Sequence, residues 1–233
     1  SPSTVVRLCK KTGFSGYREM QRALIMDLSA KQEKDSQIQE DIQREDSLEQ
    51  IIAKVTYKNM DSLETTGKLL EENTINHCVD LLEQCRSIAL FGLGSSLLVA
   101  RDACQKFLRV GKTCLVSDDW HMQLLYAKNL TRADAAIAIS YSGMTKEVLE
   151  CAAQVKQREV PLIAITRFAD SGLVRMADYN LYVAASEVLV RSGAMSSRIS
   201  QLNVIDILYT AYINRHFDEY VRQAKNTYIE KDK

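Results

Sequence analysis

The chain has 233 residues, 46% of them apolar and 26% charged, and its formal net charge is zero. This length and composition predict a globular protein with one sizeable core and an appended segment. Neutrality excludes a globally basic nucleic-acid binder, and no apolar run reaches the roughly 20 residues of a membrane span. The sequence does not open on a signal-peptide pattern, so we expect a cytoplasmic protein.

Six cysteines stand singly along the chain, without a Cys-x-x-Cys pair or histidines at metal-ligand spacing. We interpret them as reduced thiols with a structural role, because isolated cysteines behave as small buried hydrophobic residues. Only three histidines are present. We therefore expect neither a metal site nor a cofactor.

The first 34 residues form a locally basic segment. Their spacing predicts two short helices, residues 4–11 with Ser3 as the cap and residues 17–28, separated by a turn at Gly13. The charge favours an anionic partner, although a solvated helical hairpin would have the same composition. Residues 29–46 are polar and predict a linker, and two helices with apolar residues from Leu48 to Leu63 and from Ile75 to Cys85 follow it.

From residue 87 onward, short apolar runs alternate with helical patterns. We predict strands at residues 87–91, 113–117, 135–140, 161–166 and 179–184, with helices at 96–108, 119–129 and 145–158, a turn at 170–172 and a long helix from about residue 196. Such alternation predicts the α/β class, with a five-stranded parallel sheet flanked by helices. Ligands of such sheets bind at the carboxyl ends of the strands.

Two hydroxyl-rich turns fall at that edge, Gly92-Leu-Gly-Ser-Ser96 and Ser140-Tyr-Ser-Gly-Met-Thr145. A helix start presents unpaired N–H groups and the positive end of the helix dipole, which suits a phosphate. A serine at a helix start can also be no more than a cap. Because no lysine follows in a Walker pattern and no acidic residue stands where a nucleotide ribose would need one, the turns favour a small phosphorylated ligand.

The two turns resemble the paired phosphate loops of the sugar isomerase (SIS) domain family, over about residues 75–215. The segments 119–123 and 196–201, with Glu187 and Arg191 between them, look like those of RpiR/MurR-type transcriptional regulators, in which a helix-turn-helix domain precedes the SIS domain. Residues 3–17 are similar to the recognition helix and following turn of that domain. The resemblance implies a helix-turn-helix remnant at 1–34, a helical linker at 35–74 and a flavodoxin-like SIS domain at 75–233.

The resemblance also assigns roles to side chains. The phosphate-binding residues would be Ser95, Ser96, Ser140, Ser142, Gly143 and Thr145. Glu187 would meet the sugar hydroxyls, with a surface ion pair as the alternative, and His121 would contact the sugar unless its role is structural. The roles of Arg191, Arg198 and Trp120 stay open.

On the basic segment, the resemblance implies that Ser3, Thr4 and Arg7 face DNA and that Lys10 and Lys11 contact its backbone. The expected protein is a homodimeric regulator, or a dimer of dimers, that senses a hexose or amino-sugar 6-phosphate and binds operator DNA. Helices within residues 46–85 would couple the two events. The alternatives are an aldose-ketose isomerase with Glu187 as the base, and a sensor that acts through protein partners.

Overall fold

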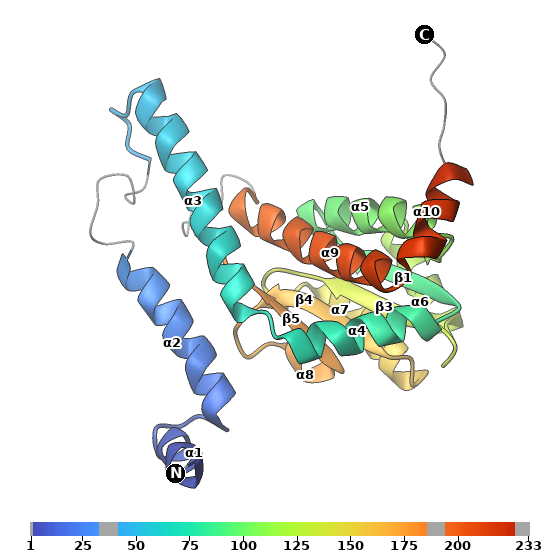
Figure 1. Cartoon of the computed structure of the whole chain (residues 1–233), viewed down its shortest axis with the longest axis horizontal. Helices are drawn as coiled ribbons and strands as arrows, with labels where there is room; N and C mark the ends of the chain where they lie inside the picture. Colours follow the sequence, from blue (N-terminus) through green and yellow to red (C-terminus); the bar gives the residue numbers. More distant parts are fainter. Residues whose placement is uncertain (1, 33–41, 186–193, 227–233) are drawn as a thin grey trace.

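The computed structural model describes residues 2–32, 42–185 and 194–226. The chain opens with four helices, α1 (Pro2–Lys11), α2 (Tyr17–Gln32), α3 (Leu48–Leu69) and α4 (Glu72–Gln84). Figure 1 shows α1 and α2 beside the body of the molecule, while α3 leads into it and α4 packs along its lower edge. The predicted Glu187 and Arg191 lie outside the described residues.

Helix α1 begins one residue before its predicted cap. Its first residue is Pro2, so Ser3 lies inside the helix and the prediction that Ser3 caps it is wrong. Proline favours a first helical position because its φ is already helical and its missing N–H would have no partner there. The helix ends before Gly13, whose φ of +91° is left-handed.

Helix α3 begins at a capping box. The Ser47 hydroxyl accepts the Gln50 N–H at 3.3 Å, and the Gln50 side-chain oxygen accepts the Ser47 N–H at 2.8 Å. This reciprocal pairing fixes the start of a helix of 22 residues, which ends at Leu69 rather than near Leu63.

The predicted five-stranded parallel sheet is confirmed. Its strands are β1 (Ser87–Gly92), β2 (Thr113–Leu115), β3 (Ala135–Ile139), β4 (Leu162–Arg167) and β5 (Tyr179–Val183). They pair in the order β2-β1-β3-β4-β5, and every pairing is parallel. The three central strands β1, β3 and β4 are buried along almost all of their length, which explains why they read as unbroken apolar runs.

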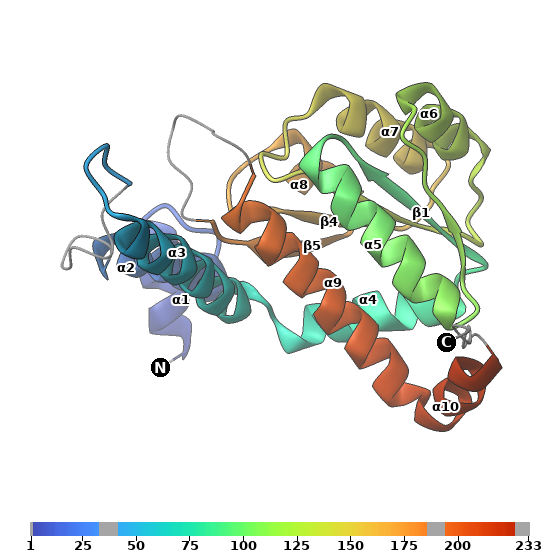
Figure 2. The same cartoon turned by 90° about the horizontal axis from the view of Figure 1, so that it is seen from above.

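Helices cover both faces of the sheet, as predicted. Figure 2 shows α4, α5 (Ser95–Arg109) and α9 (Ser196–Arg215) on one side, and α6 (Trp120–Asn129) and α7 (Lys146–Gln157) on the other. The first side buries Leu90, Phe107 and Leu208 in one cluster, and the second buries Phe91 and Val148 in another.

Two helices were not predicted from the sequence. The segment predicted as a turn at 170–172 leads into a short helix, α8 (Gly172–Met176), whose first N–H groups are capped by Ser171. The Ser171 hydroxyl accepts the Val174 N–H at 3.3 Å. At the end of the described chain, α9 breaks at His216 and α10 (Phe217–Asn226) follows.

All six cysteines are free thiols, and five of them are buried while Cys114 is half-buried. Burial raises the pKa of Cys78 and of Cys151 to about 12, so both stay protonated at neutral pH. Within the described residues, no helix is long and apolar enough to cross a membrane.

Candidate functional site

The two hydroxyl-rich turns leave neighbouring strands at the same edge of the sheet. Strands β1 and β3 pair with Gly92 opposite Ile139, and each turn begins at or directly after these residues. In the order β2-β1-β3-β4-β5 the direction of the winding reverses between β1 and β3. That reversal opens the crevice in which ligands of doubly wound sheets bind.

The first turn folds closely onto the start of α5. A Cβ at Gly92 would lie 2.8 Å from the carbonyl oxygen of Ser96, so only glycine allows this approach. Gly94 occupies the N-cap with a φ of +56° and provides no side-chain cap. Ser95 and Ser96 lie one and two residues further on, both half-buried, so neither is the cap of α5. The capping alternative is therefore wrong for these two hydroxyls.

A buried glutamine that sequence reasoning missed holds this turn in place. Gln123 on α6 is 2% exposed, and its side-chain oxygen accepts the Gly92 N–H at 3.2 Å. Its amide nitrogen donates to the carbonyl oxygens of Gly92 at 3.0 Å and of Ser117 at 2.8 Å. Gln123 lies in the segment 119–123 that carries the family resemblance, but that resemblance gave it no role.

In the second turn the hydroxyls at the two ends meet. Ser140 Oγ lies 2.8 Å from Thr145 Oγ1, and Ser140 is 3% exposed. Thr145 is the N-cap residue of α7 but makes no side-chain cap hydrogen bond, so capping does not explain its hydroxyl. Ser142 Oγ accepts the Met144 N–H at 3.2 Å. The turn thus brings three hydroxyl groups to the start of α7.

Gly143 allows this turn to pack closely against the start of α8. Its φ is +66°, and a Cβ there would lie 2.2 Å from Ser171 Oγ and 3.0 Å from Thr166 Oγ1. The Gly143 carbonyl oxygen also accepts the Leu173 N–H at 3.1 Å. The geometry of this turn therefore depends on two neighbours, Thr166 and Ser171, that the motif itself does not contain.

Tyr141 joins the second turn to the ends of two strands. Its carbonyl oxygen accepts the Thr166 hydroxyl at 3.2 Å and the Arg167 N–H at 3.0 Å. Its own hydroxyl donates to the Ala185 carbonyl oxygen at 3.4 Å. The residues that follow β5 are consequently tied to the turn by a side chain from within it.

Of the remaining predicted ligand residues, His121 lies near this edge, and Glu187 lies outside the described residues. His121 is exposed in the first turn of α6, with its ring edge-to-face to Trp120 at 5.6 Å between centroids. Trp120 packs against the core beneath α6 and α7, which favours the structural interpretation of that residue. Arg198 is half-buried in the first turn of α9.

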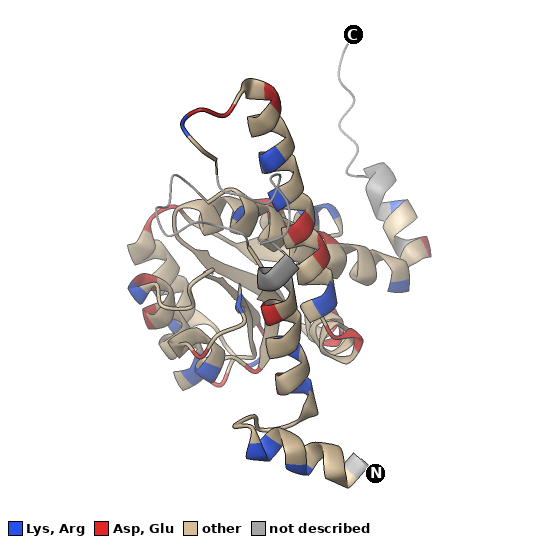
Figure 3. Cartoon of the chain, turned by 90° about the vertical axis from the view of Figure 1, so that its left-hand side faces the viewer, with Lys and Arg blue, Asp and Glu red and all other residues tan. Residues whose placement is uncertain are grey.

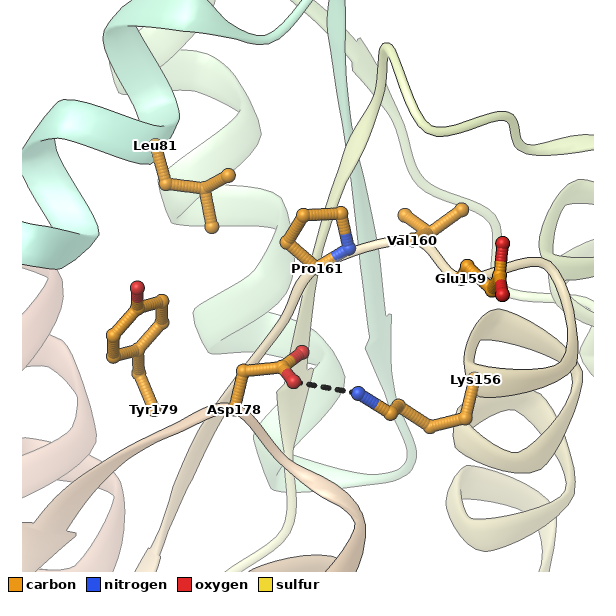
Figure 4. Close-up of a pocket in the computed structure, with 7 residues that line it drawn as sticks. All are labelled: Leu81, Lys156, Glu159, Val160, Pro161, Asp178 and Tyr179. Carbon is orange, nitrogen blue, oxygen red and sulfur yellow. Dashed lines mark hydrogen bonds and ion pairs between the residues drawn. The ribbon is translucent and has the colours of Figure 1, made fainter.

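A pocket at the opposite edge is less suited to a phosphate. It opens at the amino ends of β4 and β5, where Lys156 Nζ lies 2.6 Å from Asp178 Oδ1 (Figure 4). The second Asp178 oxygen accepts the Leu162 N–H at 2.8 Å. Its lysine is already neutralised by a carboxylate that also serves the sheet. Across the described ranges, no group of three or more histidine, cysteine or acidic side chains could hold a metal ion.

Helix α1 presents a basic, exposed surface. Its predicted DNA-contacting residues are all exposed, namely Ser3, Thr4, Arg7, Lys10 and Lys11. The opposite face packs on α2 through Cys9, which is fully buried and has its Sγ 3.7 Å from the Met20 sulfur. Figure 3 shows the Lys and Arg positions of this terminal helix without an acidic neighbour on it.

Helix α2 in turn contacts the sheet domain. The Arg22 guanidinium lies 4.9 Å from the centre of the Tyr182 ring and 2.7 Å from a Glu71 carboxylate oxygen. Ile25 and Met26 pack against an apolar cluster that includes Tyr182. The last described residues of β5 thus meet α2, close to the edge that carries the two turns.

Comparison with known proteins agrees with this architecture. Residues 81–211 match the SIS domain model. An uncharacterised HTH-type (helix-turn-helix) transcriptional regulator from Caldanaerobacter subterraneus subsp. tengcongensis is 33% identical over 97% of this chain and 79% of its own length.

Solved structures are also similar. The NanR protein of Vibrio vulnificus, complexed with ManNAc-6P, is 28% identical with a TM-score of 0.72, over 97% of this chain and 79% of that one. The sugar isomerase domain of an RpiR transcription factor from Sphaerobacter thermophilus shares the fold, with 20% identity and a TM-score of 0.68 over 76% of this chain and 97% of that one. The chain therefore belongs to the family of HTH-type transcriptional regulators that carry a SIS domain.

Proposed function

We propose that the SIS domain of this regulator binds a sugar phosphate, with the phosphate in the crevice between β1 and β3. The observation that carries this proposal is the pairing of two hydroxyl-rich turns on adjacent strands, with glycines that allow close backbone approach. Hydrogen bonds to a charged group contribute about 1.5–3 kcal/mol each, so several hydroxyls can hold a dianion without lysine. The ligands would be Ser95, Ser96, Ser140, Ser142, Gly143 and Thr145.

We further propose that His121 and Glu187 contact the sugar and that the chain binds it without converting it. An amino-sugar 6-phosphate is the first candidate, because the similar NanR structure holds ManNAc-6P. Ser3, Thr4 and Arg7 would read operator DNA, with Lys10 and Lys11 on its backbone, and the regulator would act as a homodimer in the cytoplasm. The exposure and charge of α1 support this assignment.

Coupling between the two sites would run through α3 and the end of β5. The Ala184 N–H donates to Thr66 Oγ1 at 3.0 Å, and Tyr182 lies under Arg22 of α2. A ligand changes DNA affinity only if it favours one arrangement of these elements over another.

A thermal-unfolding screen tests the proposed ligand. ManNAc-6P, glucosamine 6-phosphate and fructose 6-phosphate are compared with their unphosphorylated parents. A ligand at about 100 times its Kd stabilises by about 2.7 kcal/mol, which is a readily measured shift in Tm. Ser142→Ala should abolish the shift, whereas Thr113→Ala, at the opposite edge of the sheet, should retain it. No shift with any sugar phosphate would refute the proposal, and turnover that depends on Glu187 would favour the isomerase.

A further inference from the structure

The start of α9 buries an unusual group of polar side chains beside the first turn. Ser196, Ser197, Ser200 and Gln201 are each 3% exposed or less, and the residues that follow, such as Val204 and Ile205, are fully buried and apolar. Gln201 reaches across the interface with α5, where its Oε1 lies 3.3 Å from Ser96 Oγ. A glutamine from 105 residues away therefore holds a hydroxyl that we assign to phosphate binding.

Only the oxygen of the Gln201 side-chain amide has a hydrogen-bond partner among the described residues. Its Nε2 is buried and has no hydrogen-bond partner among the described residues, and the same holds for the neighbouring Ser200 Oγ. Leaving a buried donor without a partner is destabilising, and such groups are rare in native proteins. The other buried glutamine of the site, Gln123, uses both ends of its amide in three hydrogen bonds. The unpaired Nε2 of Gln201, next to Ser96, therefore needs a functional explanation.

We propose that Gln201 is a positioning residue for Ser96 and that its side-chain amide group rotates when a phosphate binds. This inference rests on the proposed function. Without ligand, the Ser96 hydroxyl donates its hydrogen to Gln201 Oε1. A phosphate oxygen is a stronger, charged acceptor and competes for that hydrogen.

Once the hydrogen points to phosphate, Ser96 Oγ and Gln201 Oε1 would face each other without a hydrogen between them. Rotation of the amide by about 180° replaces the oxygen by Nε2, which then donates to Ser96 Oγ. The nitrogen that is unpaired without ligand is the donor that the liganded state requires. We call this exchange of hydrogen bonds the relay. Because it involves only the Ser96 hydroxyl, it should affect binding of the phosphate group equally for every sugar.

The test uses a residue that can accept but not donate. Gln201→Glu as a carboxylate keeps the Ser96 hydrogen to itself, so ManNAc-6P should bind at least about tenfold more weakly, as should the best ligand of the screen. Gln201→Met removes both functions at similar volume and should give a smaller loss. Asn203→Asp, two residues further along the same helix, controls for the added charge.

A double-mutant cycle with Ser96→Ala separates positioning from a merely structural role. If Gln201 acts through Ser96, neither substitution should weaken binding further in the Ser96→Ala background. Gln201→Glu binding within about twofold of the parent would overturn the inference, as would a loss that persists without the Ser96 hydroxyl.

Circular dichroism establishes that each variant is folded, and the Gln201→Met cycle decides the question if Gln201→Glu does not fold. A parent that binds no sugar phosphate would refute the proposed function and this relay with it. A parent that binds, with variants that bind equally well, would refute the relay alone.

Discussion

Replacing Gly143 by alanine tests whether the second turn depends on its close contact with α8. Gly143 has a φ of +66°, where a side chain costs about 1–2 kcal/mol. The new Cβ would also lie 2.2 Å from Ser171 Oγ and 2.7 Å from Ser171 Cβ. Neither atom belongs to a long, flexible side chain, so the turn or α8 must move.

The two costs can be added because the new Cβ makes two separate contacts, one with its own backbone and one with Ser171. Overpacking of this kind costs about 1–3 kcal/mol, so Gly143→Ala should destabilise the protein by about 2–5 kcal/mol in total. Urea unfolding followed by circular dichroism measures this loss as a lower midpoint with an unchanged m value. At a temperature where the variant is still folded, its affinity for the sugar phosphate should be lower as well, because the hydroxyls of Ser140 and Thr145 move with the turn.

Two further variants separate the causes. Ser171→Gly removes the two nearest clashing atoms, so the double variant Gly143→Ala/Ser171→Gly should recover most of the overpacking cost. It should keep the backbone cost and add the few tenths of a kcal/mol lost with the Ser171 cap of α8. Gly67→Ala is the matched control, since Gly67 lies within α3 with open space around its Cα; this change should stabilise by up to about 1 kcal/mol. Gly143→Ala with the stability of the parent would refute the reasoning.

Three other features give predictions. Burial opposes ionisation of Asp134, but hydrogen bonds from Arg86 and Ser87 outweigh it and lower its pKa from 3.8 to about 2. About 2 kcal/mol of stability, present above pH 4, should therefore be lost as the pH falls towards 2, and urea unfolding of Asp134→Asn should lack this dependence. Because burial raises the pKa of Cys151 to about 12, iodoacetamide should modify this thiol only when the protein unfolds. Labelling of the native protein at a rate above its unfolding rate would contradict this. Arg22→Ala removes the contact of α2 with Tyr182 and should speed hydrogen exchange in residues 17–28, with exchange in β3 unchanged.

Much of the fold could be predicted because its signals are local. Each strand is a short apolar run, and the strands begin and end within about two residues of the predicted positions. Helix α8 was missed because five residues are too few to show a helical period, and only its Ser171 cap marks it. The error at Ser3 arose where a capping serine and a helix-starting proline stand next to each other.

The site was only partly predictable for a related reason. The two turns are contiguous in sequence, so their hydroxyls and glycines could be recognised as motifs. Gln123 and Gln201 lie 31 and 105 residues from their partners in the first turn. Whether either amide faces the turn depends on how α6 and α9 pack on the sheet, which no local pattern encodes.

Tyr141 would carry the effect of the proposed ligand beyond the two turns. Its hydroxyl donates to Ala185, the residue after Ala184, whose N–H donates to Thr66 of α3. Two residues before Ala184, Tyr182 packs against Arg22 of α2. A displacement of the second turn by a ligand therefore acts on one strand end that holds both helices. Since packed interfaces shift between discrete arrangements, a small movement there would change the position of α1, the helix to which we propose DNA contacts.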